Sequence, residues 1–123
     1  MADEYYYNCP FPKPKPTRKK KKVNGWKDKP GRTCWYTGEP GAERHEVFPG
    51  INRQNSIDHG FQVDVCSRIH QELQANGTKW ARIENQKWRM YYQKRYEDQL
   101  IKAGTTEEQA RACWLQLMGR SYL

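Results

Sequence analysis

Apolar residues recur at helical spacing through the second half of the chain. Between Asp64 and Asn76, three aliphatic residues lie four positions apart and therefore share one helical face. Asp64 is a suitable N-cap, and the pair Asn76-Gly77 is typical of a helix end. Aromatic residues and a leucine keep the same spacing within Lys79–Ala103. The pattern predicts a helix of about three turns and then a long helix.

The remaining elements are predicted from local composition. Thr105–Glu108 resembles a capping box and predicts the start of a last helix. Arg32–Tyr36 and Arg44–Phe48 are rich in β-favouring residues and are separated by a turn-forming segment at 37–43, which predicts a hairpin. Pro49–Gly60 is expected to be a long loop. Strand, strand, loop and helix, followed by two further helices, make an α+β fold.

The size and hydropathy of the chain narrow its class. With 123 residues and 36% hydrophobic content, the chain is expected to form a single domain with a modest core. No apolar run approaches the roughly 18 residues that a membrane-spanning helix needs. The acidic, tyrosine-rich start Met1–Tyr5 is unlike a secretion signal. We therefore expect a cytoplasmic protein.

The formal charge of +8 is unevenly distributed. Residues 1–40 contain ten Lys and Arg against four Asp and Glu, whereas residues 41–123 contain twelve against ten. Residues 9–22 combine prolines with seven basic residues, which predicts a flexible basic arm over residues 1–31 and a folded domain over 32–123. Such an arm suits binding to the phosphate backbone of DNA, although a solubilising tail remains the alternative. The basic residues in question are Lys13, Lys15, Arg18, Lys19, Lys20, Lys21 and Lys22.

One stretch, Glu43–Ser56, carries the candidate chemistry. It places His45 beside carboxylates in a predicted strand, continues through a segment rich in Gly and Asn, and is followed by His70 in a predicted helix. The chain between the two histidines is long enough to fold them together, which outlines a small metal site. Two ordinary polar or half-buried histidines are the alternative interpretation.

The same stretch resembles the HNH endonuclease superfamily, in particular its small phage-encoded members. The resemblance extends through Tyr92–Glu97 to the ending Met118–Leu123, and so covers roughly residues 34–123. It implies a ββα-metal core and metal-dependent hydrolysis of DNA, in a phage or prophage protein acting in the bacterial cytoplasm.

The resemblance also assigns roles to individual residues. His45 and His70 match metal ligands, with Mg²⁺ or Mn²⁺ as the implied ion, and Asn55 is chosen for the orienting asparagine of the superfamily. Glu46 stands where the superfamily has its general-base histidine, so it is expected to act as base or as an additional ligand. Phosphate contacts are assigned to basic residues around the site, namely Arg44, Arg53 and Arg68.

Many relatives also bind a structural zinc through two Cys-x-x-Cys knuckles. The corresponding positions here hold Cys34 and Cys66, and each lacks its second thiol. Two cysteines do not complete a four-ligand site, so structural zinc is not expected, and both side chains are expected to pack as small hydrophobic groups.

Two other functions stay open at this point. The glutamate at position 46 and the missing thiols are compatible with a protein that keeps the nuclease scaffold, binds nucleic acid or counters a host defence, and has no catalytic activity. A protein-interaction module, in which the aromatic helices contact a partner and the arm is only a tether, is a third reading.

Overall fold

The computed structural model describes residues 31–123, so the predicted basic arm lies outside the described residues. The described chain divides into two compact units, and the division falls between Trp88 and Arg89. Each unit is described by itself below. In residues 31–123 no helix has the length and apolarity needed to cross a membrane.

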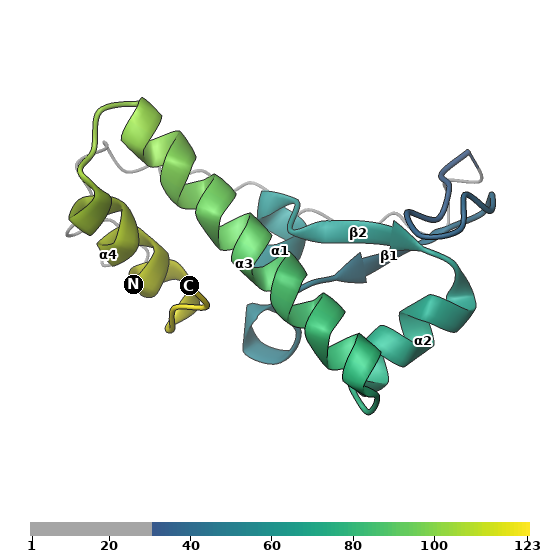
Figure 1. Cartoon of the computed structure of the whole chain (residues 1–123). Coiled ribbons are helices and arrows are strands. Elements are labelled where there is room, and N and C mark those ends of the chain that lie inside the picture. Colours follow the sequence, from purple (N-terminus) through teal and green to yellow (C-terminus); the bar gives the residue numbers. More distant parts are fainter. Residues whose placement is uncertain (1–30) are drawn as a thin grey trace. The chain divides into compact units, whose positions relative to one another are not determined.

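The first unit is built on a two-stranded antiparallel hairpin of β1 (Glu43–Glu46) and β2 (Gln62–Val65). Helix α2 (Ser67–Ala75) follows β2 almost directly, as Figure 1 shows. A two-stranded hairpin with a helix, followed by two longer helices, is the predicted α+β fold, and that prediction is confirmed.

The prediction that Arg32–Tyr36 forms a strand paired with β1 was wrong. Arg32–Tyr36 contains only an isolated bridge, between Thr33 and Pro40, and its chain turns back on itself instead of pairing with β1. Two backbone hydrogen bonds of 2.8 Å close this turn, from the amide of Cys34 to the carbonyl of Glu39 and from the amide of Gly38 to the carbonyl of Cys34. Gly38 has a φ of 77°, which a glycine adopts without strain. β1 therefore pairs with β2 and not with this segment.

The predicted loop at 49–60 is also largely helical. It contains a 3₁₀ turn at Gly50–Asn52 and helix α1 (Arg53–His59). The hydroxyl of the fully buried Ser56 holds α1 to the end of β1, because it accepts a hydrogen bond from the amide of Phe48 (3.0 Å) and donates one to the carbonyl of Phe48 (2.9 Å). This bond pattern joins residues eight apart and leaves no periodic signal in the sequence.

Helix α2 begins two residues later than predicted. Its N-cap is Cys66, whereas Asp64 lies within β2 opposite Arg44. The predicted apolar face is present, since Ile69 and Leu73 are both buried. The helix ends at Asn76, whose left-handed φ of 54° fits the predicted stop.

Both C-terminal helices form where the sequence predicts them. Helix α3 spans Lys79–Lys102, and α4 spans Glu107–Met118. Thr106 caps α4 in a capping box whose partner is Gln109. The side-chain amide of Asn85, in the first turns of α3, donates from Nδ2 to the carbonyl of Leu73 and to Oδ1 of Asn76, both at 2.9 Å, and so ties α3 to the end of α2.

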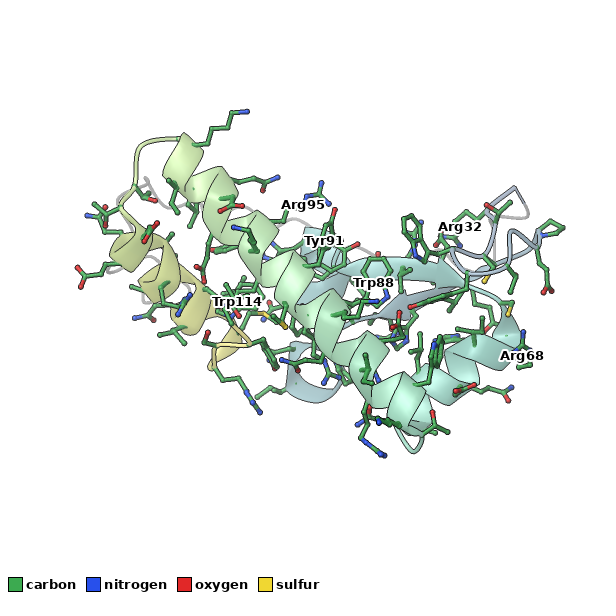
Figure 2. All side chains as sticks on the ribbon, viewed as in Figure 1. Arg32, Arg68, Trp88, Tyr91, Arg95 and Trp114 are labelled. Atoms are coloured by element: carbon green, nitrogen blue, oxygen red, sulfur yellow. The ribbon has the colours of Figure 1, made fainter. Side chains whose placement is uncertain are left out.

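The second unit packs the rest of α3 against α4 and the chain end. Trp114, labelled on α4 in Figure 2, is fully buried and donates from Nε1 to the carbonyl of Arg120 at 2.8 Å. The buried Gln93 donates to Glu97 (2.7 Å) and to Ser121 (3.0 Å), and it accepts a bond from the amide of Tyr122. Side-chain hydrogen bonds, together with apolar burial, therefore hold the C-terminal residues in place.

Candidate metal centre

The two histidines of the predicted site lie side by side. His45 is in β1 and is 5% exposed, and His70 is in the second turn of α2. Their ring centroids are 5.3 Å apart, and the rings meet edge to face at 75°. The predicted convergence of these two imidazoles is confirmed, because the hairpin places the strand directly beside the helix that follows it.

Glu43 holds the ring of His70. Its Oε1 lies 2.6 Å from His70 Nδ1, and both side chains are mostly buried, with exposed fractions of 28% and 15%. Glu43 and His45 are two positions apart in β1, so both face α2. Sequence reasoning did not assign Glu43 a role, although this period-two spacing was the signal that points to it.

This arrangement suits a metal ligand chemically. Metal-binding histidines usually donate their second ring N–H to a carboxylate, which fixes the tautomer and turns the other nitrogen toward the ion. With Nδ1 of His70 on Glu43, Nε2 would be the ligand atom if His70 bound a metal ion. In residues 31–123 no group of three or more His, Cys, Asp or Glu side chains is placed to bind a metal ion, so His45 and His70 would supply two protein ligands. Imidazole ligands suit Fe, Ni, Cu and Zn, whereas Mg²⁺ and Mn²⁺ prefer oxygen ligands.

Glu46, at the predicted base position, is engaged elsewhere. Its Oε1 lies 2.9 Å from Nε of Arg53, and Glu46 is 12% exposed whereas Arg53 is 55% exposed. Because successive strand residues point to opposite faces, Glu46 lies on the face of β1 away from His45. The structure therefore brings Glu46 together with Arg53 and not with the two histidines.

The other face of the hairpin also carries a basic pair. Asp64 Oδ1 lies 3.8 Å from Nε of Arg44 and 3.8 Å from Nε of Arg32. Burial lowers the pKa of the Arg32 guanidinium, and the neighbouring charge of Arg44 lowers it further, whereas Asp64 raises it. Arginine remains charged despite such shifts, so two positive charges share one carboxylate here.

The remaining predicted site residues are spread over the first unit. Asn55 lies on α1, and its side-chain amide donates to Oδ1 of Asn52 at 3.2 Å, a bond local to that turn. Arg68 lies on α2 and is exposed (Figure 2). His59, at the end of α1, is exposed and stacks on Phe61 with centroids 5.4 Å apart. The predicted DNA-binding residues 13–22 lie outside the described residues.

Cys34 and Cys66, the two cysteines compared above with zinc-knuckle positions, differ in environment. Cys34 is 2% exposed, as expected for a packed side chain, whereas Cys66 is half-buried. Burial raises the pKa of the Cys34 thiol, but hydrogen bonds from the Thr37 hydroxyl and from the amides of Cys66, Thr37 and Tyr36 together lower that pKa to about 7. The Cys34 side chain is therefore buried, as predicted, and in addition its thiol has a lowered pKa.

Comparison of the chain with protein-family models, with curated proteins and with solved structures found no match in any of the three.

Proposed function

We propose that this protein is an HNH-like, metal-dependent endonuclease acting on DNA, with one divalent cation bound by His45 and His70. The observation that carries the proposal is the pair of adjoining imidazoles, one of them anchored by Glu43 at 2.6 Å. The antiparallel pairing of β1 with β2, followed directly by α2, supports it, because the resemblance to the superfamily implies a ββα core; here α1 lies between the two strands. The net charge of +8 supports a polyanionic substrate.

The chain's own residues divide the work in this proposal. His45 and His70 position the cation, and Glu43 keeps His70 in the tautomer that binds it. When bound, the cation supplies charge neutralisation at the scissile phosphate. Mg²⁺ or Mn²⁺ is the ion that the resemblance to the superfamily implies, and Mn²⁺ is used in the test below. Arg53, 55% exposed at the start of α1, is placed to contact the DNA backbone, and Glu46, on the face of β1 away from the two histidines, holds the Arg53 guanidinium through their ion pair.

Plasmid nicking tests this proposal. Supercoiled plasmid is incubated with purified protein and Mn²⁺, with and without a chelator, and the nicked form is measured on a gel. His45→Ala and His70→Ala are expected to lose nicking, whereas His59→Ala, a histidine outside the pair, keeps it. The proposal fails if nicking does not depend on metal, or if His45→Ala nicks as well as the unchanged protein.

A second candidate function is nucleic-acid binding without catalysis. The observation that favours it is the Glu46–Arg53 ion pair, which occupies the carboxylate at the base position and points it away from the two histidines. A scaffold with this arrangement keeps its positive charge and its fold while the proton acceptor is removed from the metal. DNA binding would then be independent of the cation.

Binding measurements separate the two functions. For the non-catalytic protein, DNA affinity falls with salt, is unchanged by chelator, and is accompanied by no cleavage in any of several divalent cations. The logarithm of the binding constant should fall by roughly 0.9 per phosphate contact for each unit of log salt concentration. Replacing Lys19–Lys22 by alanine should reduce that slope. Cleavage that disappears in His45→Ala while DNA binding is retained would instead support the endonuclease.

A further inference from the structure

We propose that the exposed face of α3 in the second unit binds single-stranded DNA, with phosphates on its cations and an unpaired base on the ring of Tyr91. The inference rests on the proposed function only in taking DNA as the partner, because it involves neither the two histidines nor the divalent cation. It adds the structure of the substrate, a strand with unpaired bases, to that function.

The face is formed by one row of side chains on α3, which we call the α3 row. Residues three or four positions apart share one side of a helix, and Figure 2 shows Tyr91 and Arg95 on the same side of α3. From Tyr91 to Lys102 the row extends about 16 Å along the helix axis, the length of roughly five stacked nucleotides. The row lines a hollow of about 400 Å³ with the side chains of Tyr91, Lys94, Arg95, Asp98, Gln99 and Lys102.

The α3 row has an excess of positive charge. Among the described residues that line the hollow, Lys94, Arg95 and Lys102 are exposed cations and Asp98 is the one carboxylate. Nζ of Lys94 lies 3.3 Å from Oδ2 of Asp98, but these side chains are 70% and 57% exposed, so their ion pair contributes little. Within residues 31–123, Arg95 and Lys102 pair with no carboxylate. A polyanion is the ligand that complements this surface.

The other carboxylate in this part of α3 does not neutralise the row. Glu97 is 7% exposed and accepts hydrogen bonds from Nε2 of Gln93 (2.7 Å) and from Nε of Arg111 (2.8 Å). It therefore lies on the side of α3 that packs against α4 and the chain end. Three cations against one carboxylate leave two net positive charges on the exposed face.

Tyr91 distinguishes this surface from a plain basic patch. Its ring is 52% exposed and contacts the ring of the buried Tyr92 edge to face, with centroids 5.0 Å apart. This contact restrains the Tyr91 ring while about half of its surface stays open to a ligand. Exposed rings beside cations are what proteins use to stack the bases of single strands. In a duplex both faces of each internal base are covered by neighbouring bases, so an unpaired strand is the form that suits Tyr91.

Fluorescence anisotropy with the full chain, in the presence of a chelator, tests the proposal. The probe is a labelled oligothymidylate, and the comparison probes are a duplex of the same length and an oligoglutamate of the same charge. The single strand should bind most tightly, because it alone combines phosphates with open base faces. Since no metal is present, the result does not depend on whether the protein nicks DNA.

Substitutions separate the ring from the charges. Tyr91→Ala should weaken single-strand binding about 5- to 150-fold, and Tyr91→Phe, which restores a stacking ring, should recover that affinity. Replacing Arg95 and Lys102 together by glutamine should reduce the salt slope by roughly 1.4, at roughly 0.7 per phosphate contact of a single strand. The matched control replaces Lys79 and Arg82 by glutamine; both are exposed residues of the first unit, and the slope should not change.

Three results would overturn the proposal. A duplex or an oligoglutamate that binds as tightly as the single strand would show a general anion surface. Unchanged binding by Tyr91→Ala would remove the stacked base, and equal salt slopes for the two double variants would place the phosphate contacts elsewhere. None of these results affects metal-dependent nicking, and a protein without nicking activity still gives all of them. Circular dichroism checks that each variant is folded.

Discussion

Replacing Tyr36 by phenylalanine removes a single hydroxyl that ties the turn at 33–40 to α3. The Tyr36 hydroxyl donates to Glu84 Oε1 at 2.8 Å and accepts from Nε1 of Trp88 at 2.8 Å. The ring itself stays in contact with Trp80, at a centroid distance of 5.3 Å, and phenylalanine preserves that contact. The substitution therefore tests the two hydrogen bonds almost alone.

The expected loss follows from the chemistry of the two bonds. A hydrogen bond to a charged acceptor contributes about 1.5 to 3 kcal/mol, and one between neutral groups about 0.5 to 1.5 kcal/mol. Glu84 is 13% exposed and keeps its ion pair with Lys87 at 3.1 Å when the Tyr36 hydroxyl is removed. This remaining partner reduces the free energy that the Glu84 carboxylate loses with the hydroxyl. We expect the free energy of unfolding to fall by about 2 kcal/mol.

Urea unfolding at pH 7, followed by tryptophan fluorescence, measures this change. Tyr91→Phe is the matched control, because Tyr91 lies in the second unit and is 52% exposed. The control should stay within about 0.5 kcal/mol of the unchanged protein. A Tyr36→Phe protein as stable as the control would show that the hydroxyl does not hold the turn.

The same hydroxyl predicts a dependence on pH. Burial raises the pKa of Tyr36 to about 12, Trp88 opposes that shift, and Glu84 adds to it. The ordinary tyrosine pKa is about 10. Since the folded-state pKa lies above the unfolded one, this contribution to stability is complete below about pH 10 and is lost as pH rises toward 12. Tyr36→Phe should unfold with less dependence on pH across that window, and an equally steep loss would contradict the assignment.

Three further substitutions test other parts of the structure. Glu43→Gln should weaken Mn²⁺ binding roughly 10- to 100-fold by calorimetry, and unchanged affinity would separate this carboxylate from the metal site. Asn85→Ala, which removes two hydrogen bonds at 2% exposure, should cost about 2 to 3 kcal/mol of unfolding free energy in urea; a cost below about 0.5 would refute its role between α2 and α3. Gln93→Ala should speed hydrogen exchange at the amide of Tyr122, and unchanged protection there would mean that other contacts hold the chain end.

Helix prediction succeeded where the sequence carries a long periodic signal or a local cap. α3, a helix of 24 residues, was predicted almost to its last residue because aromatic residues and a leucine recur every four positions from Trp88 to Leu100. α4 was predicted from a capping box at Thr105–Glu108, a motif that closes within four residues, and the observed box lies one residue later, at Thr106 and Gln109. In both cases the deciding interactions lie within one element.

Prediction failed where bonds between distant residues decided the outcome. Arg32–Tyr36 has strand composition, yet β1 pairs with β2 and leaves that segment as a turn. Helix α1 lacks an apolar repeat and is held by the buried Ser56 hydroxyl on Phe48. α2 begins later than predicted because Asp64, the predicted N-cap, pairs with Arg44 in the ladder of β1 and β2.

The candidate site shows the same division. By itself, the sequence determined which imidazoles and carboxylates were available and that a strand and a helix would carry the two histidines, since those properties depend on residue type and local pattern. Only the tertiary structure decided that Glu43 would hold His70 while Glu46 would turn to Arg53 on the opposite face. The physical reason is the pleat of a strand: neighbouring residues face opposite ways, and which face meets the helix depends on pairing between segments far apart in the chain.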